Sequence, residues 1–310
     1  MAAFVVPDTL DQHRADKILA TVAGLSRSVA RSLFDGERVF VDGRPITPSV
    51  RLPAGVRIEA EIPEVETTIE PDPSVPFEVV FESERTIVVD KPAGVVVHPG
   101  AGIAGGTLAG GLLDRFSELR DLPDEARWGI VHRLDRDTSG VLLVARDAAA
   151  HRILQDQLRR REIGRQYRAL VLGTFDNATG TIEAPIGRDP DHPTRMAVVH
   201  DGRPAVTHYR RLATWEDEDV TLLGVTLETG RTHQIRVHMR AVGHPVVGDA
   251  KYGRTGVPGD PGRTWLHAVR IEFDDPTSGE RRSVRSPVPP DLTEALATLG
   301  PPSRGSVPVD

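Results

Sequence analysis

The chain has 310 residues, of which 39% are hydrophobic and 27% charged, and it contains no cysteine. This composition argues against a collagen-like or wholly disordered protein, and the absence of cysteine excludes disulfides, thiolate nucleophiles and cysteine-bound metals. No apolar run approaches the ~18 residues that a membrane span needs. No basic start followed by an apolar block marks a signal peptide, so we expect a cytoplasmic protein without a membrane anchor.

The net charge of −7 is unevenly distributed along the chain. The stretch from Glu59 to Glu84 holds nine acids and no Lys or Arg, so the rest of the chain carries a net charge of +2. From His13 to Ile58, eight bases stand against four acids. A small N-terminal unit with this excess of positive charge is compatible with a nucleic-acid partner. A solvated surface of mixed charge would have the same composition.

The N-terminal part predicts two helices followed by strands. Apolar spacing predicts one helix over residues 16–23 and a second after Ser26, a suitable N-cap, ending at Gly36. Residues 39–41 are then predicted to form a strand, and the Asp-Gly pair after them is predicted to form a turn. Residues 56–62 are predicted to form the returning strand.

The bases of this part supply candidate RNA-binding residues. Arg27 and Arg31 are four positions apart, so they share one helical face near the helix N-terminus, where exposed amides also favour phosphates. The whole candidate set is Arg14, Lys17, Arg27, Arg31 and Arg38. The order helix–helix–hairpin, with the sequence SRSVARSLFDGERVFVDGRPI, resembles the alpha-L RNA-binding domain of the ribosomal protein S-four type. The resemblance covers residues 13–62 and implies an RNA-binding domain over residues 1–62.

The remainder of the chain divides into a linker, a large domain and a tail. Residues 63–76 carry four prolines among acids and predict an extended linker. Residues 77–300 predict an α+β domain in which strands outnumber helices. Its helices are expected from the N-cap Asp147 to Leu158 and over residues 231–241. Strands are expected at residues 77–81, 86–89, 95–97, 129–131, 141–145, 168–172, 206–212 and 221–227. Residues 301–310 are expected to be a disordered tail.

The densest polar cluster of the chain is VHRLDRDTSG at residues 131–140, between two apolar strands. Asp135 lies between Arg133 and Arg136, whose charges favour the ionised carboxylate. A fixed, ionised carboxylate can act as a nucleophile or as a base. A salt-bridged turn without a catalytic role would fit the same residues, and these residues alone favour that alternative.

Four motifs, taken together, favour catalysis. They are DKPAGVVVHPG at residues 90–100, HRLDRDTSG at 132–140, RQYRALVLG at 165–173 and LETGRTHQIRVHMRAVGHPVVGDAKYG at 227–253. In this order they resemble the RluA family of pseudouridine synthases. With the N-terminal domain, the chain is similar to the RluD-like branch, which modifies large-subunit ribosomal RNA. The resemblance implies a mixed, mainly antiparallel sheet with flanking helices, the pseudouridine synthase fold, and an RNA substrate.

The resemblance also implies roles for four residues. Asp135 would start the reaction by attacking the sugar, by acting as a base there, or by adding to the uracil ring. Arg236 would pair with Asp135 and aim it. Tyr167 would pack on the uracil and take the carbon-5 proton. Arg133 would fill the gap left by a flipped uridine. The isomerisation needs no metal and no cofactor.

One position departs from the family pattern, and two alternatives compete with this interpretation. The family commonly carries lysine where this chain has Arg165, which keeps the charge and changes its geometry. A non-catalytic RNA-binding or ribosome-assembly protein could use the same two domains. A metal-dependent hydrolase could use His233, His238 and His244, although their spacings of five and six do not match a zinc-binding helix. We expect a monomer, because no long exposed apolar helix or heptad repeat occurs.

Overall fold

The computed structural model describes residues 1–23, 25, 27–62, 69–99, 105–192 and 194–308; the side chains of residues 27, 28 and 124–126 also lie outside the description. The chain divides into two units, Met1–Thr68 and Ile69–Asp310, each with its own hydrophobic core. Among the described helices, none combines the length and the apolar composition needed to cross a bilayer.

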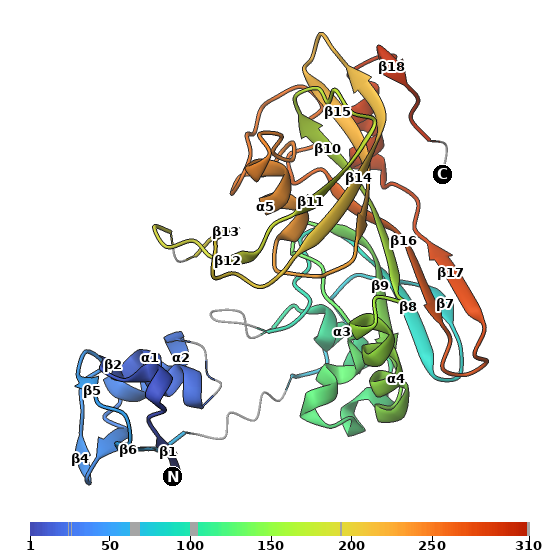
Figure 1. The fold of residues 1–310 in the computed structure, drawn as a ribbon. Helices are drawn as coiled ribbons and strands as arrows, with labels where there is room; N and C mark the ends of the chain where they lie inside the picture. The colour runs from blue at the N-terminus through green and yellow to red at the C-terminus, as the bar shows by residue number, and fades with distance from the viewer. Residues whose placement is uncertain (24, 26, 63–68, 100–104, 193, 309–310) are drawn as a thin grey trace. The chain divides into compact units, whose positions relative to one another are not determined.

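The first unit combines two helices and short strands around one core (Figure 1). Its elements are β1 (Ala2–Val5), η1 (Asp8–Leu10), β2 (His13–Arg14), α1 (Ala15–Val22), α2 (Arg27–Asp35), β3 (Val39–Val41), β4 (Arg44–Pro45), β5 (Arg51–Leu52) and β6 (Arg57–Ala60). The sheet order is β1-β6-β3-β4, and β2 pairs with β5. Both helices lie within about one residue of their predicted ranges. The strand that returns directly from β3 is β4, whereas β6, the expected hairpin partner, pairs with the other edge of β3.

The second unit is built on a ten-stranded sheet (Figure 1). Its strands are β7 (Glu78–Glu82), β8 (Thr86–Lys91), β9 (Ser139–Ala145), β10 (Gly164–Leu172), β11 (Thr179–Glu183), β14 (Val206–Trp215), β15 (Val220–Leu227), β16 (Leu266–Asp274), β17 (Arg281–Arg285) and β18 (Arg304–Gly305). The order is β11-β14-β15-β10-β16-β9-β8-β7, with β17 beside β16 and β18 beside β14. Among the described pairs, β9–β16 is parallel and the others are antiparallel. The predicted mixed, mainly antiparallel α+β domain is therefore confirmed.

Helices and a small hairpin complete this unit. They are α3 (Leu108–Arg115), α4 (Ala148–Arg159), α5 (Gln234–Ala241), α6 (Pro290–Ala297), η2 (Ser117–Asp121), η3 (Asp124–Gly129), and the pair β12 (Ile186–Arg188) and β13 (Met196–Val198). Asp147 caps α4 as predicted, because its carboxylate accepts from the amides of Ala149 and Ala150, each at 2.9 Å. Residues 95–97 and 129–131 do not form the expected strands, since each segment makes one isolated bridge instead.

Helix α3 contains two consecutive glycines, and the sequence did not predict it. Gly110 and Gly111 lie inside the helix, where glycine normally costs about 1 kcal/mol relative to alanine. At Gly111, a Cβ atom would lie 3.0 Å from Cβ of Val75 and 3.1 Å from Cε1 of Phe77. The glycines therefore let α3 pack closely against the segment that precedes β7.

The expectation of a disordered tail over residues 301–310 is wrong for the described residues 301–308, which include strand β18. The amide of Ser303 donates to Thr214 at 2.8 Å, and that of Ser306 donates to Leu212 at 3.0 Å. These bonds place β18 beside the end of β14, where β14 extends past its pairing with β11. Main-chain pairing of this kind does not depend on side-chain composition, so the polar tail gave no sign of it.

Gly140 offers a test of the junction between β9 and β16. It pairs with Ala268 and has φ of +116°, and a Cβ atom there would lie 2.2 Å from the Ala268 carbonyl oxygen. We expect Gly140→Ala to lower the free energy of unfolding by more than about 3 kcal/mol in urea denaturation. Gly279→Ala is the control, because Gly279 also has positive φ but nothing within 4 Å; it should cost about 1 kcal/mol. Equal losses would refute the steric explanation.

Candidate active site

The polar cluster forms a loop that the neighbouring strands hold at both ends. The amide of Val131 donates to Leu143 O at 3.1 Å, and Nε2 of His132 accepts from the amide of Leu143 at 3.2 Å. Burial, together with the charge of Arg165, lowers the pKa of His132 to about 3, which favours the neutral ring as an acceptor. A turn closes at Asp135, whose carbonyl accepts from the amide of Thr138 at 3.2 Å.

The DKPAG segment supports the middle of this loop. The ammonium of Lys91 is fully buried and donates to the carbonyls of Pro92, Val95 and Arg136 at 2.8, 2.9 and 3.1 Å. The Arg136 carbonyl also accepts from the amide of Gly94 at 2.8 Å. Burial lowers the pKa of Lys91 to about 7 against the opposing effect of nearby carboxylates. The main chain directly after Asp135 is thus fixed from two sides.

Arg236, on α5, joins two carboxylates from distant parts of the chain. Its Nη1 donates to Oδ2 of Asp135 at 2.9 Å. Its Nε and Nη2 donate to the two carboxylate oxygens of Asp249 at 2.6 and 2.9 Å, a bidentate pair. The side chains of Asp135, Arg236 and Asp249 are 14%, 9% and 0% exposed. Asp135 is therefore the most exposed member of this chain of charges, and Asp249 is completely enclosed.

The charges of this group stabilise one another. Burial alone would lower the pKa of Arg236, but the hydrogen bonds and charges of Asp249 and Asp135 outweigh it and raise the pKa above its usual value. Burial alone would raise the pKa of Asp249, but Arg236 and two backbone amides hold it below its usual value. The guanidinium is thus kept charged, and it aims the Asp135 carboxylate through a hydrogen bond.

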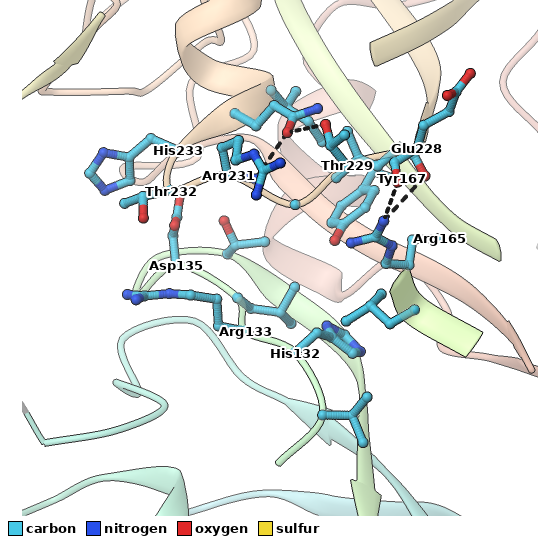
Figure 2. Close-up of a pocket in the computed structure, with 18 of the residues that line it drawn as sticks. His132, Arg133, Asp135, Arg165, Tyr167, Glu228, Thr229, Arg231, Thr232 and His233 are labelled. Carbon is cyan, nitrogen blue, oxygen red and sulfur yellow. Dashed lines mark hydrogen bonds between the residues drawn. The ribbon is translucent and has the colours of Figure 1, made fainter. Parts of the chain in front are cut away.

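The segment before α5 is organised by Gln234. Its Oε1 accepts from the hydroxyl of Thr229 at 2.8 Å and from the amide of Arg231 at 2.9 Å. Its Nε2 donates to Val206 O at 2.9 Å, which ties the segment to β14. These contacts form one wall of a cavity (Figure 2). They also explain why α5 begins at Gln234, three residues later than predicted.

The four predicted site residues, Asp135, Tyr167, Arg236 and Arg133, all line this cavity, which has a volume of about 820 Å³ (Figure 2). Arginines dominate its lining: Arg127, Arg133, Arg159, Arg161, Arg165, Arg203, Arg231 and Arg236. The lining acids are Asp135 and Glu228. Arg133 is exposed, and the described ion pair of Asp135 is with Arg236, not Arg133. The cavity thus combines a strongly positive wall with one aimed carboxylate.

Strand β10 places Arg165 and Tyr167 on the cavity side of the sheet. Tyr167 is buried, and burial raises the pKa of its phenol, while the charge of Arg165 acts in the opposite direction. Nη2 of Arg165 donates to the carbonyls of Glu228 and Leu227 at 3.1 and 3.5 Å (Figure 2). A Cβ atom on Gly230 would lie 2.6 Å from Nη1 of Arg165, so a side chain at position 230 would require the guanidinium to shift.

The candidate RNA-binding residues of the first unit fall into two groups. Arg14 and Lys17 line a cavity of about 240 Å³ together with Arg51, which was not among the candidates. Arg31 and Arg38 are exposed elsewhere on the unit, and Arg31 lies 3.7 Å from Asp35 in an ion pair. The side chain of the fifth candidate, Arg27, lies outside the described residues.

Sequence reasoning missed two residues of the cavity region. Asp249 lies in the motif segment HPVVGDAKYG, and no role was predicted for it from the sequence. Its position between two glycine-containing turns was the feature that could have marked it as a site residue. His98 lines the cavity from the segment after β8, and burial lowers its pKa to about 4.

The three histidines of the metal hypothesis each contact different groups. His233 contacts the hydroxyl of Tyr252. His238 contacts the hydroxyl of Thr207 and the carbonyl oxygen of Ala184. His244 contacts the carbonyl oxygen of Leu172. Among the described residues, no three His, Asp or Glu side chains gather as a metal site.

Comparisons with known proteins agree with this geometry. Residues 85–241 match the RNA pseudouridylate synthase family. A protein of Chloroflexus aurantiacus, described as an uncharacterized RNA pseudouridine synthase, is 46% identical over 95% of this chain and 92% of its own length. The ribosomal large subunit pseudouridine synthase D of Nitrosomonas europaea is 42% identical over 95% of this chain and 86% of its own. Human RNA pseudouridylate synthase domain containing 1 has a similar structure, with a TM-score of 0.57, 30% identity, and coverage of 73% of this chain and 90% of its own.

These similarities extend over nearly the whole chain, and the matched family region contains the Asp135 loop, β10 and α5. A protein that only binds RNA is therefore not favoured. The chain belongs to the RNA pseudouridylate synthase family and is an enzyme that converts uridine in RNA to pseudouridine.

Proposed function

We propose that this enzyme modifies uridines of large-subunit ribosomal RNA and that Asp135 starts the reaction. The substrate follows from the names of relatives such as the Nitrosomonas europaea protein. The role of Asp135 rests on one observation: its carboxylate is held by Arg236 at 2.9 Å in an arginine-lined cavity of about 820 Å³. Such a volume lies within the roughly 300–1,000 Å³ of ordinary ligand pockets.

The reaction rearranges bonds within one nucleotide. The bond between sugar carbon 1′ and N1 breaks, a bond from carbon 1′ to carbon 5 forms, carbon 5 loses a proton and N1 gains one. Asp135 can attack carbon 1′, act as a base at the sugar, or add to the ring. In each case the carboxylate must be aimed at the nucleotide, and the hydrogen bond from Arg236 fixes its direction.

Tyr167 and Arg133 complete the proposed site. A uridine inside structured RNA must leave its stack to reach Asp135. The exposed Arg133 is suited to fill the vacated space, and Tyr167 to pack on the uracil. If Tyr167 also takes the carbon-5 proton, its phenol must reach the anionic form, which burial disfavours and the charge of Arg165 favours. This assigns Arg165 a supporting role beside Tyr167.

The domain assignment belongs to the same proposal. Residues 1–62 act as an alpha-L RNA-binding domain, joined by an acidic linker to the catalytic domain. The linker is shorter than the expected residues 63–76, because Ile69 and Val75 are buried in the core of the second unit, and the catalytic domain extends past residue 300 to include β18. The enzyme acts as a monomer in the cytoplasm, where bacteria such as Chloroflexus aurantiacus and Nitrosomonas europaea make ribosomal RNA. No metal or cofactor takes part.

Asp135→Asn tests the proposed catalytic residue. The amide has the shape of the carboxylate but neither its charge nor its nucleophilicity, so we expect tritium release from carbon-5-labelled uridine in ribosomal RNA to fall by more than about 10⁴-fold. RNA affinity should change less than about 3-fold, because the cavity keeps its arginines. Asp137→Asn, whose carboxylate pairs with Arg136 on the same loop, is the control and should retain activity. Turnover by the Asp135 variant would refute the assignment.

Arg165 can be tested by keeping or removing its charge. Arg165→Lys preserves a cation beside Tyr167 and should lose less than about 10-fold in kcat. Arg165→Met removes the cation, so the pKa of Tyr167 should rise further and the pH–rate profile should move to higher pH, with kcat near neutrality falling ~10²-fold. Identical pH profiles for the two variants would contradict an electrostatic role.

The N-terminal proposal predicts the salt dependence of RNA binding. Deleting residues 1–62 removes Arg14, Lys17, Arg31 and Arg38, so RNA affinity should fall and its dependence on salt should flatten, since fewer counterions are released. Filter binding of ribosomal RNA at several salt concentrations measures both. The full-length variant Arg14→Gln/Lys17→Gln should show a smaller change in the same direction. An unchanged affinity and slope for the deletion would show that this unit does not bind RNA.

A further inference from the structure

A second arginine-rich pocket lies on the face of the sheet opposite the active site. Alternate residues of a strand point to opposite faces, so Gln166 and Arg168 of β10 face away from the cavity lined by Arg165 and Tyr167. This second pocket has a volume of about 350 Å³. Its polar lining consists of Gln166, Arg168, Arg210, Arg270, Arg285 and Ser286.

The four arginines come from four strands and form two rows across the sheet. In one row, Arg270 of β16 lies directly opposite both Gln166 of β10 and Arg285 of β17. In the other, Arg168 of β10 and Arg210 of β14 each lie opposite Gly224 of β15. A Cβ atom on Gly224 would lie 3.6 Å from Nη1 of Arg168, so the guanidinium extends over this glycine. The rows therefore make one continuous basic surface.

A β-bulge in β16 turns Arg270 towards this surface. Tyr167 pairs with Ala268, whereas the adjacent Gln166 pairs with Arg270, which leaves Val269 as an extra residue. Without the bulge, Arg270 would share a face with Ala268. Bulges re-aim side chains beside functional sites, and this one brings Arg270 opposite Arg285.

The charge of the pocket is not balanced within its lining. Among the described lining residues, none is Asp or Glu. Two carboxylates approach from outside: Glu272 pairs with Arg270, and Asp90 accepts from the Ser286 hydroxyl at 2.5 Å. The described lining thus holds four arginines and no acid of its own. Like charges directly opposite each other destabilise a sheet, so the placement of Arg270 and Arg285 is better explained by an anionic ligand than by folding.

From this geometry we infer that the second arginine pocket binds backbone phosphates of the same RNA substrate, at a distance from the uridine that enters the active site. The inference rests on the proposed ribosomal RNA substrate. Neighbouring strands are ~4.8 Å apart, so the path from β14 through β15, β10 and β16 to β17 spans roughly 19 Å. A single phosphate cannot engage arginines over that length, whereas a polynucleotide backbone can. The planar guanidinium also suits phosphate oxygens.

Because the two pockets face opposite sides of the sheet, an RNA can occupy both only if it passes around the sheet. A short stem–loop that fills the active site is therefore expected to leave the second pocket empty, while a long ribosomal RNA fragment reaches it. The pocket would then increase affinity for long substrates and leave the chemical step unchanged.

The test compares two triple variants of the full chain on two RNA substrates. Arg168→Gln/Arg210→Gln/Arg285→Gln removes three charges of the pocket and keeps Arg270, which pairs with Glu272. The matched control is Arg120→Gln/Arg281→Gln/Arg304→Gln, which removes three exposed arginines that line neither pocket. The substrates are a large-subunit ribosomal RNA transcript and a short stem–loop around a mapped target uridine.

On the transcript, we expect the pocket variant to raise KM and the dissociation constant by about 10-fold or more and to lower the salt slope of binding by roughly 2–3 relative to the control, with kcat unchanged. On the stem–loop, kcat/KM should stay within about 2-fold of the wild type. Lysine at the same three positions should restore most of the affinity, which separates lost charge from misfolding.

Other results would overturn the inference. These are equal transcript binding by the pocket and control variants, an equal loss on the stem–loop, or a pocket that binds inorganic phosphate while transcript binding is unaffected. Failure of the proposed function looks different, because wild-type protein would then form no pseudouridine in either RNA. Binding to the transcript would still report on the pocket in that case.

Discussion

The bond between Arg236 and Asp135 is the interaction on which the site depends. A buried guanidinium or carboxylate loses several kcal/mol of hydration, and this loss is tolerable only if its hydrogen-bonding groups find partners. Asp249 supplies two of those partners and is itself completely enclosed, so it fixes Arg236 before any substrate arrives. Removing Arg236 would leave the enclosed Asp249 carboxylate without its ion-pair partner, at about 3–5 kcal/mol. The Asp135 carboxylate is thus held by Arg236, and Arg236 is held in turn by the enclosed Asp249.

The sheet explains how distant motifs come together at this site. The parallel contact of β9 with β16 places the end of the Asp135 loop beside the strand that neighbours β10, which carries Tyr167. The DKPAG segment holds the loop through the three carbonyl bonds of Lys91. Each motif of the sequence therefore either lines the cavity or fixes a segment that does.

The sequence was most informative where chemistry and local periodicity coincide. Asp135, Tyr167, Arg236 and Arg133 came from motifs, and all four line one cavity. The boundaries of α1 and α2 followed from apolar spacing, and those of α4 from apolar spacing and the cap Asp147; both signals act within a few residues. The expected cap of α2, Ser26, lies outside the described residues. Asp249 could not be assigned, because its function is to pair with an arginine that only tertiary folding brings near. Helix α3 and the ordered tail were missed because close packing at glycine and main-chain pairing leave little trace in composition.

Because of the bulge at Val269, the number of residues in β16 matters as much as their identity. Before the bulge, Ala268 shares the face of Tyr167. Beyond it, Arg270 and Glu272 are half-exposed, while Ile271 and Phe273 are buried. Deleting one residue there would exchange the two sides of every later position in the strand, placing charges in the core and a phenylalanine in water. A related chain that lacks the bulge would need a compensating change in β17 or in the β16–β17 turn to keep the same hydrophobic core.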